Sequence, residues 1–460
     1  MKFIGREKEL RELETEFARK QSFVILYGRR RIGKTTLIRE FIRDKPALYF
    51  FATQETDAQS RKNFADAVSD FTGQDYLKRT SFTHWEDIFQ IFASYQPEVK
   101  KILVIDEFQN LAAANSAFAS IFQKIWDTIL AGQNIMVILC GSYIRMMTDL
   151  TLSASSPLYG RRTSQILLKP LSFMDIRNYF TEKSFEETAE IFAVTSGVPK
   201  YLEFFDNEKS VFENIEESII NPHGYLYDEP IFLLGNEITE PAGYFSLLKS
   251  VAAGNRKLAD LASVMEKRAN TLSPYLKVLE DMQYLRRLVP ATELHPEKSR
   301  KGIYVIADSF IFFWFLFVYP NRSLIEMGNI SAVMEKIRAE FVPRFMGFVY
   351  EDICREIFVR LCIEGNIPFQ PVRVGYYADK STEIDICAVD AAGKIFAGEC
   401  KFRTSTPVDI RVLSELKMKC RRSFAEKKVV YGLFSNTRFD EMLLSSVDDD
   451  VFLIEKTNVI

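Results

Sequence analysis

Two glycines, a lysine and a threonine stand at a fixed spacing in Gly28-Arg29-Arg30-Arg31-Ile32-Gly33-Lys34-Thr35. This segment matches the phosphate-loop pattern G-x-x-x-x-G-K-[ST] in full. A phosphate group needs several backbone N–H donors aimed at one point, and Gly28 and Gly33 keep side chains out of that space. We expect Lys34 to reach the β- and γ-phosphates, Thr35 to hold Mg²⁺ and Thr36 to contact the nucleotide. The segment therefore predicts a site for ATP and Mg²⁺.

The residues around this loop predict the elements that position it. Ser22 to Leu26 is an apolar run that predicts a buried strand, and Leu37 to Ile42 has the apolar spacing of a helix. A second apolar run, Ile102 to Ile105, ends in Asp106-Glu107. Ligands bind at the carboxyl ends of parallel strands, so we expect Asp106 to hold Mg²⁺ through water and Glu107 to deprotonate the attacking water.

Three further polar residues could contact the nucleotide. A strand predicted over Ile135 to Leu139 is followed by Ser142, which could touch the γ-phosphate or cap a helix, and one side chain can do both. Arg161 and Arg162 precede another predicted strand, Gln165 to Leu168. Either arginine could act as an arginine finger in a neighbouring subunit of a homo-oligomer, or both could be ordinary surface residues.

A second group of chemically capable residues lies near the C-terminus. Three consecutive strands are predicted over Arg373 to Tyr377, Glu383 to Val389 and Ile395 to Phe402. Alternation along the last strand places Glu399 and Lys401 on one face, and a hairpin can bring Asp385 beside them. Glu351 could join them from a helix predicted over Phe345 to Leu361.

Two carboxylates and a lysine suit a metal-dependent nuclease centre. Asp385 and Glu399 would bind a second Mg²⁺ or Mn²⁺, and Lys401 would steady the attacking water or the charge of the transition state. A salt-bridged hairpin accounts for the same residues, but flanking helices, including one at about Ile410 to Phe424, favour the nuclease fold. The basic residues of that last helix could follow a phosphate backbone or simply face solvent.

Between these two groups the chain predicts helical modules. Three helices and a hairpin are expected over Tyr244 to Ala252, Leu258 to Met265, Asn270 to Met282, Leu285 to Val289 and Ile303 to Ile306, the order of a winged helix. The third helix carries Lys277 but also Glu280 and Asp281, so DNA contact and a purely structural coupling role both stay open. The predicted domains are an ATPase core at 1–168, a helical lid at 169–238, a winged helix at 239–322 and a nuclease-like domain at 323–460.

Composition narrows the class of protein. The 460 residues are 47% hydrophobic and 26% charged, as expected for a globular protein of several domains. The net charge of -3 excludes a global basic field that would attract nucleic acid. Six cysteines without a C-x-x-C pair signal neither a zinc site nor a disulfide framework, which fits a cytoplasmic protein. No signal-peptide core is seen, and the apolar run Phe310 to Val318 is too short to span a membrane, so it is expected to be buried core.

Taken in order, these motifs resemble the archaeal-type ATPase family, a branch of the AAA+/STAND-related P-loop NTPases. The resemblance covers nearly the whole chain and rests on Phe3 to Glu7, Gly28 to Thr35, Ile102 to Glu107, Pro157 to Arg162, Gly197 to Pro199 and Gly398 to Lys401. It implies an α/β protein: a P-loop parallel sheet with a helical lid, a winged helix and a restriction-endonuclease-like C-terminal domain of the PD-(D/E)XK type. It also implies that Arg6 lies beside the adenine and that Pro199 belongs to the lid over the base. The usual Pro-Asp is Ile384-Asp385 here.

The expected function is ATP binding and hydrolysis, coupled to a nuclease-like domain that interacts with DNA. The alternative is a nucleotide-dependent signalling switch whose nuclease fold is only a binding module. Intact Asp385, Glu399 and Lys401 favour the first function. The acidic net charge and the mixed charges of the third helix favour the second.

Overall fold

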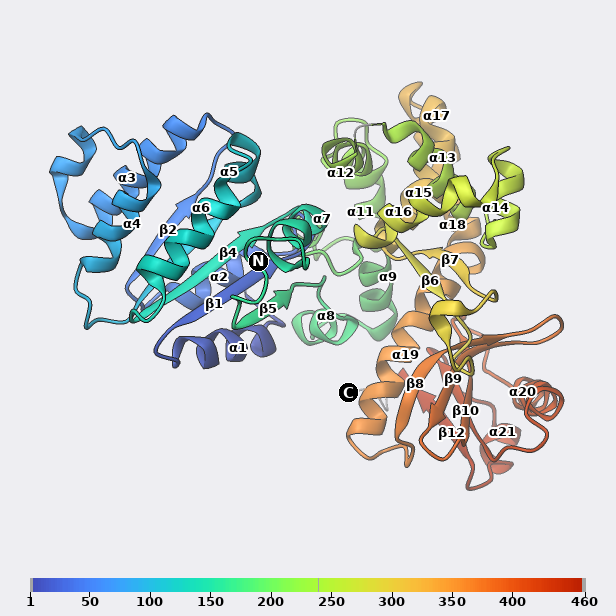
Figure 1. Cartoon of the computed structure of the whole chain (residues 1–460). Coiled ribbons are helices and arrows are strands. Elements are labelled where there is room, and N and C mark those ends of the chain that lie inside the picture. The colour runs from blue at the N-terminus through green and yellow to red at the C-terminus, as the bar shows by residue number, and fades with distance from the viewer. Residues whose placement is uncertain (1–2, 239, 457–460) are drawn as a thin grey trace. The chain divides into compact units, whose positions relative to one another are not determined.

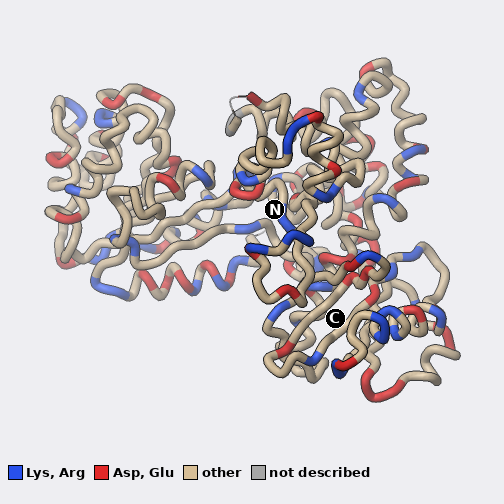
Figure 2. Tube along the Cα trace, turned by 45° about the vertical axis from the view of Figure 1, so that its right-hand side comes forward, with Lys and Arg blue, Asp and Glu red and all other residues tan. Residues whose placement is uncertain are grey.

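The computed structural model describes residues 3–238 and 240–456, which form two compact units (Figure 1). The N-terminal unit comprises Met1–Leu171 with Val198–Lys200, and the C-terminal unit comprises Ser172–Gly197 with Tyr201–Ile460. The first boundary, after Leu171, lies close to the predicted end of the ATPase core at residue 168. Basic and acidic residues intermingle along both units (Figure 2). None of the described helices combines the length and the apolarity needed to cross a bilayer.

The N-terminal unit is built on a five-stranded sheet in the order β2-β3-β4-β1-β5, and every described strand pair in it is parallel. The strands are β1 (Ser22–Tyr27), β2 (Ala47–Phe51), β3 (Lys101–Asp106), β4 (Ile135–Gly141) and β5 (Ser164–Leu167). The expected parallel α/β sheet is confirmed. All carboxyl ends of these strands therefore lie at one edge, where the phosphate loop and the acidic pair emerge.

Successive residues of the central strands pack into two different cores. Val24 and Leu26 of β1 pack with Leu37 and Phe41 of the following helix, on one face of the sheet. Phe23 and its alternating neighbours pack into the larger core on the other face. Because both faces are covered, the strands are continuous apolar runs rather than alternating ones.

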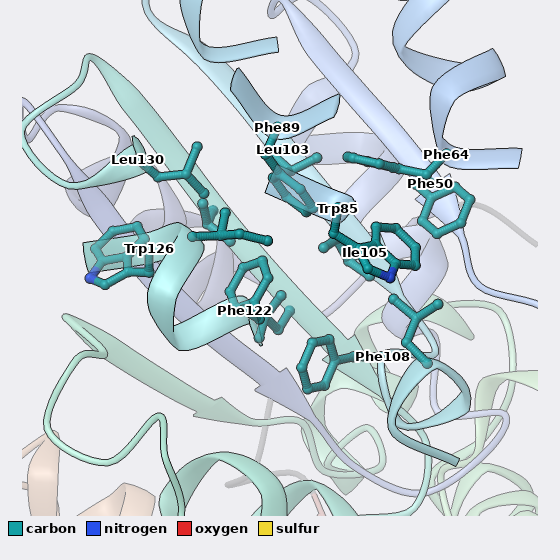
Figure 3. Close-up of a cluster of buried hydrophobic side chains, with 14 of the residues drawn as sticks. Phe50, Phe64, Trp85, Phe89, Leu103, Ile105, Phe108, Phe122, Trp126 and Leu130 are labelled. Atoms are coloured by element: carbon teal, nitrogen blue, oxygen red, sulfur yellow. The ribbon is translucent and has the colours of Figure 1, made fainter. Parts of the chain in front are cut away.

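Aromatic side chains dominate the larger core (Figure 3). Phe64 and Phe89 lie with their ring centroids 4.6 Å apart, and Trp85 meets Phe118 edge-on at 4.9 Å. Such pairs contribute about 0.5 to 1.5 kcal/mol each beyond the area they bury. Phe108, directly after the acidic pair, belongs to the same cluster, so the core fixes the backbone beneath the acidic residues.

The helices of the N-terminal unit connect and cover these strands. They are α1 (Glu7–Phe17), α2 (Lys34–Ile42), α3 (Asp57–Thr72), α4 (Trp85–Ser94), α5 (Gln109–Ala114), α6 (Phe118–Ile125) and α7 (Ile144–Met147). Helix α2 begins at the lysine of the phosphate loop, and the acidic pair leads into α5. The order of strand, loop and helix at the phosphate loop is the predicted one.

The C-terminal unit begins with helices and continues into a second sheet. The first helices are α8 (Phe173–Tyr179), α9 (Phe185–Thr195), α11 (Val211–Asn214) and α12 (Glu229–Glu237), while α10 (Pro199–Leu202) begins on residues of the N-terminal unit. Next come α13 (Pro241–Ala252), α14 (Leu258–Val264), α15 (Ala269–Asp281) and an antiparallel pair, β6 (Leu285–Leu288) with β7 (Ile303–Ile306). Three helices and a hairpin thus follow one another in the expected order.

An aromatic segment joins this region to the last sheet. Phe310, Phe313 and Trp314 are fully buried, as expected for core, and the ring of Phe313 lies 5.3 Å from that of Phe345. The helices here are α16 (Ser309–Phe313), α17 (Arg322–Glu326), α18 (Ile330–Glu340) and α19 (Gly347–Ile363).

The last sheet has five strands in the order β12-β11-β10-β9-β8. Strands β8 (Pro371–Ala378), β9 (Glu383–Asp390) and β10 (Ile395–Lys401) are antiparallel neighbours, while β11 (Val429–Ser435) and β12 (Val451–Glu455) run parallel to β10. Helices α20 (Ile410–Ser423) and α21 (Glu441–Ser445) connect the parallel strands. Phe358 of α19 stacks on Phe396 at 4.2 Å, whereas Leu416 of α20 packs in the core that contains Ala397. Alternate residues of β10 therefore meet two different helices.

Candidate functional site

The two glycines of the phosphate loop occupy positions that a side chain would disturb. Gly28 has φ of 155°, and a Cβ there would lie 2.4 Å from the backbone oxygen of Leu168. Gly33 has φ of 89° and caps α2. L-residues rarely adopt these conformations, so the loop needs glycine at both positions. The N–H groups at the start of α2 and in the adjoining loop form a cradle suited to phosphate.

Lys34 lies over this loop. Its side chain is buried, and its ammonium donates hydrogen bonds to the backbone oxygens of Gly28 at 2.9 Å and Arg29 at 2.8 Å. The positive charge is therefore already held above the loop. Thr36, in the same turn of α2, is exposed.

The two residues predicted to face Mg²⁺ meet directly. The hydroxyl of Thr35 donates to Oδ2 of Asp106 at 3.0 Å, and Asp106 is only 1% exposed. The hydroxyl of Tyr49 donates to the same oxygen. Burial and the nearby Asp106 both raise the pKa of Tyr49, so this hydroxyl keeps its proton. Hydroxyl and carboxylate oxygens are the ligands that Mg²⁺ prefers, and the donor set fits that ion.

Glu107 is held by two polar side chains. Ser142 donates to Oε1 at 2.6 Å, and the amide nitrogen of Gln109 donates to Oε2. Glu107 has φ of 54°, a conformation uncommon outside glycine, and its own N–H bonds to Oδ1 of Asp106 at 2.9 Å. The carboxylate is thus fixed in direction at the edge of the sheet.

The structure excludes one of the two roles that the sequence suggested for Ser142, the helix cap. The cap position of α7 is Tyr143, not Ser142, because β4 extends to Gly141 and delays the helix. The alternative of a helix N-cap at Ser142 is therefore wrong, and its hydroxyl serves Glu107 instead.

Arg6 and Pro199 both lie against the phosphate loop. The buried guanidinium of Arg6 donates to the backbone oxygens of Ile32 at 3.0 Å and Lys169 at 2.8 Å. The ring of Pro199 would be 3.8 Å from a Cβ on Gly33. Arg6 therefore stabilises the phosphate loop of its own chain. Contact of either residue with the adenine stays a prediction.

The two arginines at 161 and 162 have different surroundings. Arg161 forms a bidentate ion pair with Asp127, at 2.8 and 2.7 Å, and also donates to the backbone oxygen of Pro157 at 2.9 Å. Arg162 lies near the end of β1: burial raises the pKa of Tyr27 and the charge of Arg162 opposes that rise. An arginine-finger role for Arg161 would require its pair with Asp127 to break.

The structure brings the predicted C-terminal residues together. Gly398 pairs with Ile386 across β9 and β10, so Asp385 and Glu399 follow at the next position along the two strands. Oδ2 of Asp385 accepts the backbone N–H of Cys400 at 2.8 Å. Glu399 is buried and accepts hydrogen bonds from Lys401 at 2.9 Å and from Lys419 of α20.

The charges of this group act on one another. Burial, with a contribution from Asp385, raises the pKa of Glu351 to about 8, although Arg355 opposes the shift. Burial and the charge of Glu399 raise the pKa of Asp385 to about 6. Burial alone would raise the pKa of Glu399 as well, but the two lysines outweigh it and lower that pKa. Glu351, Asp385, Glu399 and Lys401 therefore form one electrostatically coupled group.

The same group also contains the ion pair, Glu399 with Lys401, that a salt-bridged hairpin without a metal would have. Both oxygens of Glu399 face lysines, so a cation bound there would displace one of them. Within residues 3–238 and 240–456, no three His, Cys, Asp or Glu side chains are arranged to hold a metal ion. The predicted second metal stays a prediction.

Four residues at these sites were not predicted from the sequence: Tyr49, Gln109, Arg355 and Lys419. Gln109 follows Glu107 by two positions, and this proximity was an available signal. A prediction of Tyr49 would have needed the order of the strands, which places β2 beside β3. A prediction of Arg355 and Lys419 would have needed the rotation of α19 and α20 about their helix axes, and the sequence does not give that rotation.

Comparisons with known proteins identify the family of this chain. Residues 3–205 match the model of a family described as an ATPase domain predominantly from Archaea, and residues 314–413 match one described as "Archaea bacterial proteins of unknown function". The uncharacterized protein MJECL04 of Methanocaldococcus jannaschii is 32% identical over 433 residues, which cover 94% of this chain and 93% of that protein. The chain belongs to the archaeal-type ATPase family.

Two further likenesses concern parts of this archaeal-type ATPase. The uncharacterized ATP-binding protein MJ0423 of the same organism is 48% identical over 44 residues, 9% of this chain and 75% of that protein. The structure of the Walker-type ATPase PABY2304 of Pyrococcus abyssi superposes with a TM-score of 0.52 at 19% identity, covering 68% of this chain and 96% of that one. This second likeness supports the P-loop α/β fold.

Proposed function

We propose that the N-terminal unit binds ATP with Mg²⁺ and hydrolyses it. The observation that carries this proposal is the contact of Thr35 with Asp106 beside a complete phosphate loop. Lys34 would face the β- and γ-phosphates, while Thr35 and Asp106 would hold Mg²⁺, Asp106 through water. Bound Mg²⁺ would neutralise charge that develops on the phosphate oxygens.

The base in this proposal is Glu107. Its carboxylate would accept the proton of the water that attacks the γ-phosphate. Ser142 and Gln109 would orient it, because each holds one of its two oxygens. Arg162, or Arg161 after release from Asp127, would add a positive charge from a neighbouring subunit.

Substitution of Lys34 tests the nucleotide site. Lys34→Ala removes the charge facing the phosphates, so we expect ATP affinity to fall by more than about ten-fold, since a hydrogen bond to a charged group is worth roughly 1.5 to 3 kcal/mol. Isothermal titration calorimetry measures the affinity. Lys124→Ala, which removes an exposed lysine paired with Glu86, is the matched control. Unchanged affinity in Lys34→Ala would refute the assignment.

We further propose that the C-terminal sheet domain is a PD-(D/E)XK-type module that interacts with DNA. Its support is the convergence of Glu351, Asp385, Glu399 and Lys401 on neighbouring elements. With Mg²⁺ or Mn²⁺ bound by the acids, the group has the composition of a nuclease centre. Incubation with supercoiled and single-stranded DNA, with and without each metal, tests cleavage. Asp385→Asn should abolish any metal-dependent cleavage that the wild type shows.

The helices before this domain form the proposed winged helix. Its third helix, α15, offers little free positive charge, because Lys277 pairs with Asp281 at 2.8 Å. At the tip of the hairpin Lys301 pairs with Glu293 at 2.7 Å. These pairs favour a structural coupling role over insertion of α15 into a DNA groove.

A nucleotide-dependent switch is the second candidate function, and one contact favours it. Glu356 of α19 accepts the backbone N–H groups of Phe173 at 3.1 Å and Met174 at 3.0 Å, at the start of α8. The first helix after the ATPase sheet is thus bound to the helix that carries Glu351. Metal-dependent cleavage abolished by Asp385→Asn would exclude a purely non-catalytic switch.

A further inference from the structure

The C-terminal domain contains an open cavity of about 720 Å³ away from the group around Glu399. Three short segments that precede strands form it: Lys394 before β10, Lys427 and Lys428 before β11, and Asp449 and Asp450 before β12. The end of α20 closes it with Arg421 and Phe424. The cavity therefore lies at the amino ends of the parallel strands, whereas Glu399 and Lys401 lie at the carboxyl end of β10.

The basic residues of this domain divide into paired and unpaired groups. Arg411 pairs with Asp409 at 2.6 Å, Lys417 with Asp448 at 2.9 Å, and Lys419 with Glu399. The four basic residues that line the cavity are Lys394, Arg421, Lys427 and Lys428. In the part of the chain that the structure describes, none of these four side chains forms an ion pair.

Four unpaired cations around one cavity repel one another, and an anionic ligand would relieve that repulsion. Asp449 and Asp450 also line the cavity, so the positive charges are separated by negative ones and do not meet at a single point. A free triphosphate concentrates its charge at one point and would face both carboxylates. Phosphates spaced along a strand match cations that come from three separate segments.

The walls also suit a nucleic acid. Phe424 is buried and Tyr431 and Phe452 are half-buried, and all three line the cavity. Aromatic rings beside basic side chains are the usual means of holding a strand without regard to sequence. A cavity of this volume also falls in the range that accepts nucleotide-sized groups.

We propose that this cavity is an accessory binding site for the phosphates of a nucleic-acid strand. Four residue steps along β10 lead from Ile395, next to the cavity residue Lys394, to Glu399, a distance of about 13 Å at roughly 3.3 Å per residue. One strand of a duplex covers that distance in about four nucleotides. Because helices cover both faces of β10, a single nucleic acid that contacts the cavity and the Glu399 group together would pass over the domain surface and be longer than this minimum. This inference rests on the proposed interaction of the domain with DNA.

The test compares two double variants of the full chain that lose the same charge. Lys427→Gln with Lys428→Gln removes two cations of the cavity, and Arg411→Gln with Lys209→Gln removes two ion-paired cations away from it. Fluorescence anisotropy with labelled single-stranded and duplex DNA gives the affinity at several salt concentrations. We expect the cavity variant to bind all sequences more weakly and its salt slope to fall by about two, roughly one per lysine, with a smaller change in the control.

Each outcome decides between the proposals. An unchanged salt slope in the cavity variant, with wild-type protein that binds DNA, would overturn the accessory site and leave the proposed function standing. Wild-type protein that binds no nucleic acid at low salt would overturn both. ATP or inorganic phosphate is then titrated against the labelled DNA on Lys34→Ala protein, whose phosphate loop is disabled. Displacement of the DNA there would assign the cavity to a free phosphate compound instead.

Discussion

Replacement of Glu107 by glutamine is a conservative change that the structure lets us follow atom by atom. The carboxylate accepts from Ser142 at Oε1 and from the amide nitrogen of Gln109 at Oε2. A glutamine has one accepting oxygen and one donating nitrogen, so its nitrogen would face the donor of Gln109. The amide oxygen of Gln109 is buried and has no hydrogen-bond partner. A flip of that amide would restore the bond with donor and acceptor exchanged.

The expected effect is therefore confined to catalysis. Both contacts of residue 107 can survive, so the melting temperature and the ATP affinity of Glu107→Gln should stay close to those of the wild type. The amide cannot accept the proton of water, and general-base catalysis contributes about 10² to 10⁴ in rate. At about 1.36 kcal/mol per factor of ten, this is a rise of roughly 2.7 to 5.4 kcal/mol in the barrier to hydrolysis.

Single-turnover phosphate release measures this effect without interference from product release. Calorimetry with ATP and a thermal melt of the same preparation serve as controls for binding and folding. Asn110→Asp is a matched variant that exchanges an amide and a carboxylate nearby, since the side chain of Asn110 donates to the backbone oxygen of Ala52 and not to the carboxylate of Glu107. Hydrolysis by Glu107→Gln at the wild-type rate would refute the assignment of Glu107 as the base.

Three other predictions concern the loop, the subunits and pH. Gly28→Ala should weaken ATP binding strongly, because its methyl would meet a backbone oxygen at 2.4 Å, whereas Gly235→Ala, with open space around it, should not. We expect hydrolysis per subunit to rise with protein concentration if Arg161 or Arg162 serves a neighbouring site, and a constant rate from a confirmed monomer would exclude that role. Burial and two neighbouring glutamates raise the pKa of Glu190 to about 7, so its contribution to stability should be lost as pH rises from about 4.5 to 7. Glu190→Gln should therefore raise the melting temperature at pH 8 and flatten its pH dependence.

The nucleotide site could be predicted because its signal is local. The glycines, Lys34 and Thr35 lie on one strand, loop and helix, and their spacing alone sets the loop. The meeting of Thr35 with Asp106 followed from the rule that parallel strands end at one edge. Gln109 was missed because its contact depends on the unusual backbone of Glu107, which turns the chain between the two residues.

The group around Glu399 in the C-terminal domain could be predicted only in part from the sequence. The hairpin of β9 and β10 could be predicted, since alternation and register bring Asp385 beside Glu399. The partner Lys419 could not, because it sits in a helix with several lysines and arginines, and only the packing of Leu416 and Cys420 against the sheet decides which of them points at Glu399. The basic helix was therefore predicted as one surface, whereas the structure divides its residues between ion pairs and the cavity.

Helix α19 carries two neighbouring carboxylates with different partners. Glu351 and Arg355 lie one turn apart and pair at 3.1 Å within the coupled acidic group. Glu356, the next residue, accepts the first N–H groups of α8 instead. Because a helix moves as a rigid element, a shift of α8 that moved α19 would carry Glu351 with it. Glu356 is half-buried, and burial raises its pKa. Once ionised, its carboxylate accepts the N–H groups at the start of α8 more strongly. Within the C-terminal unit, a single carboxylate thereby links the position of α8 to the acidic group around Glu351.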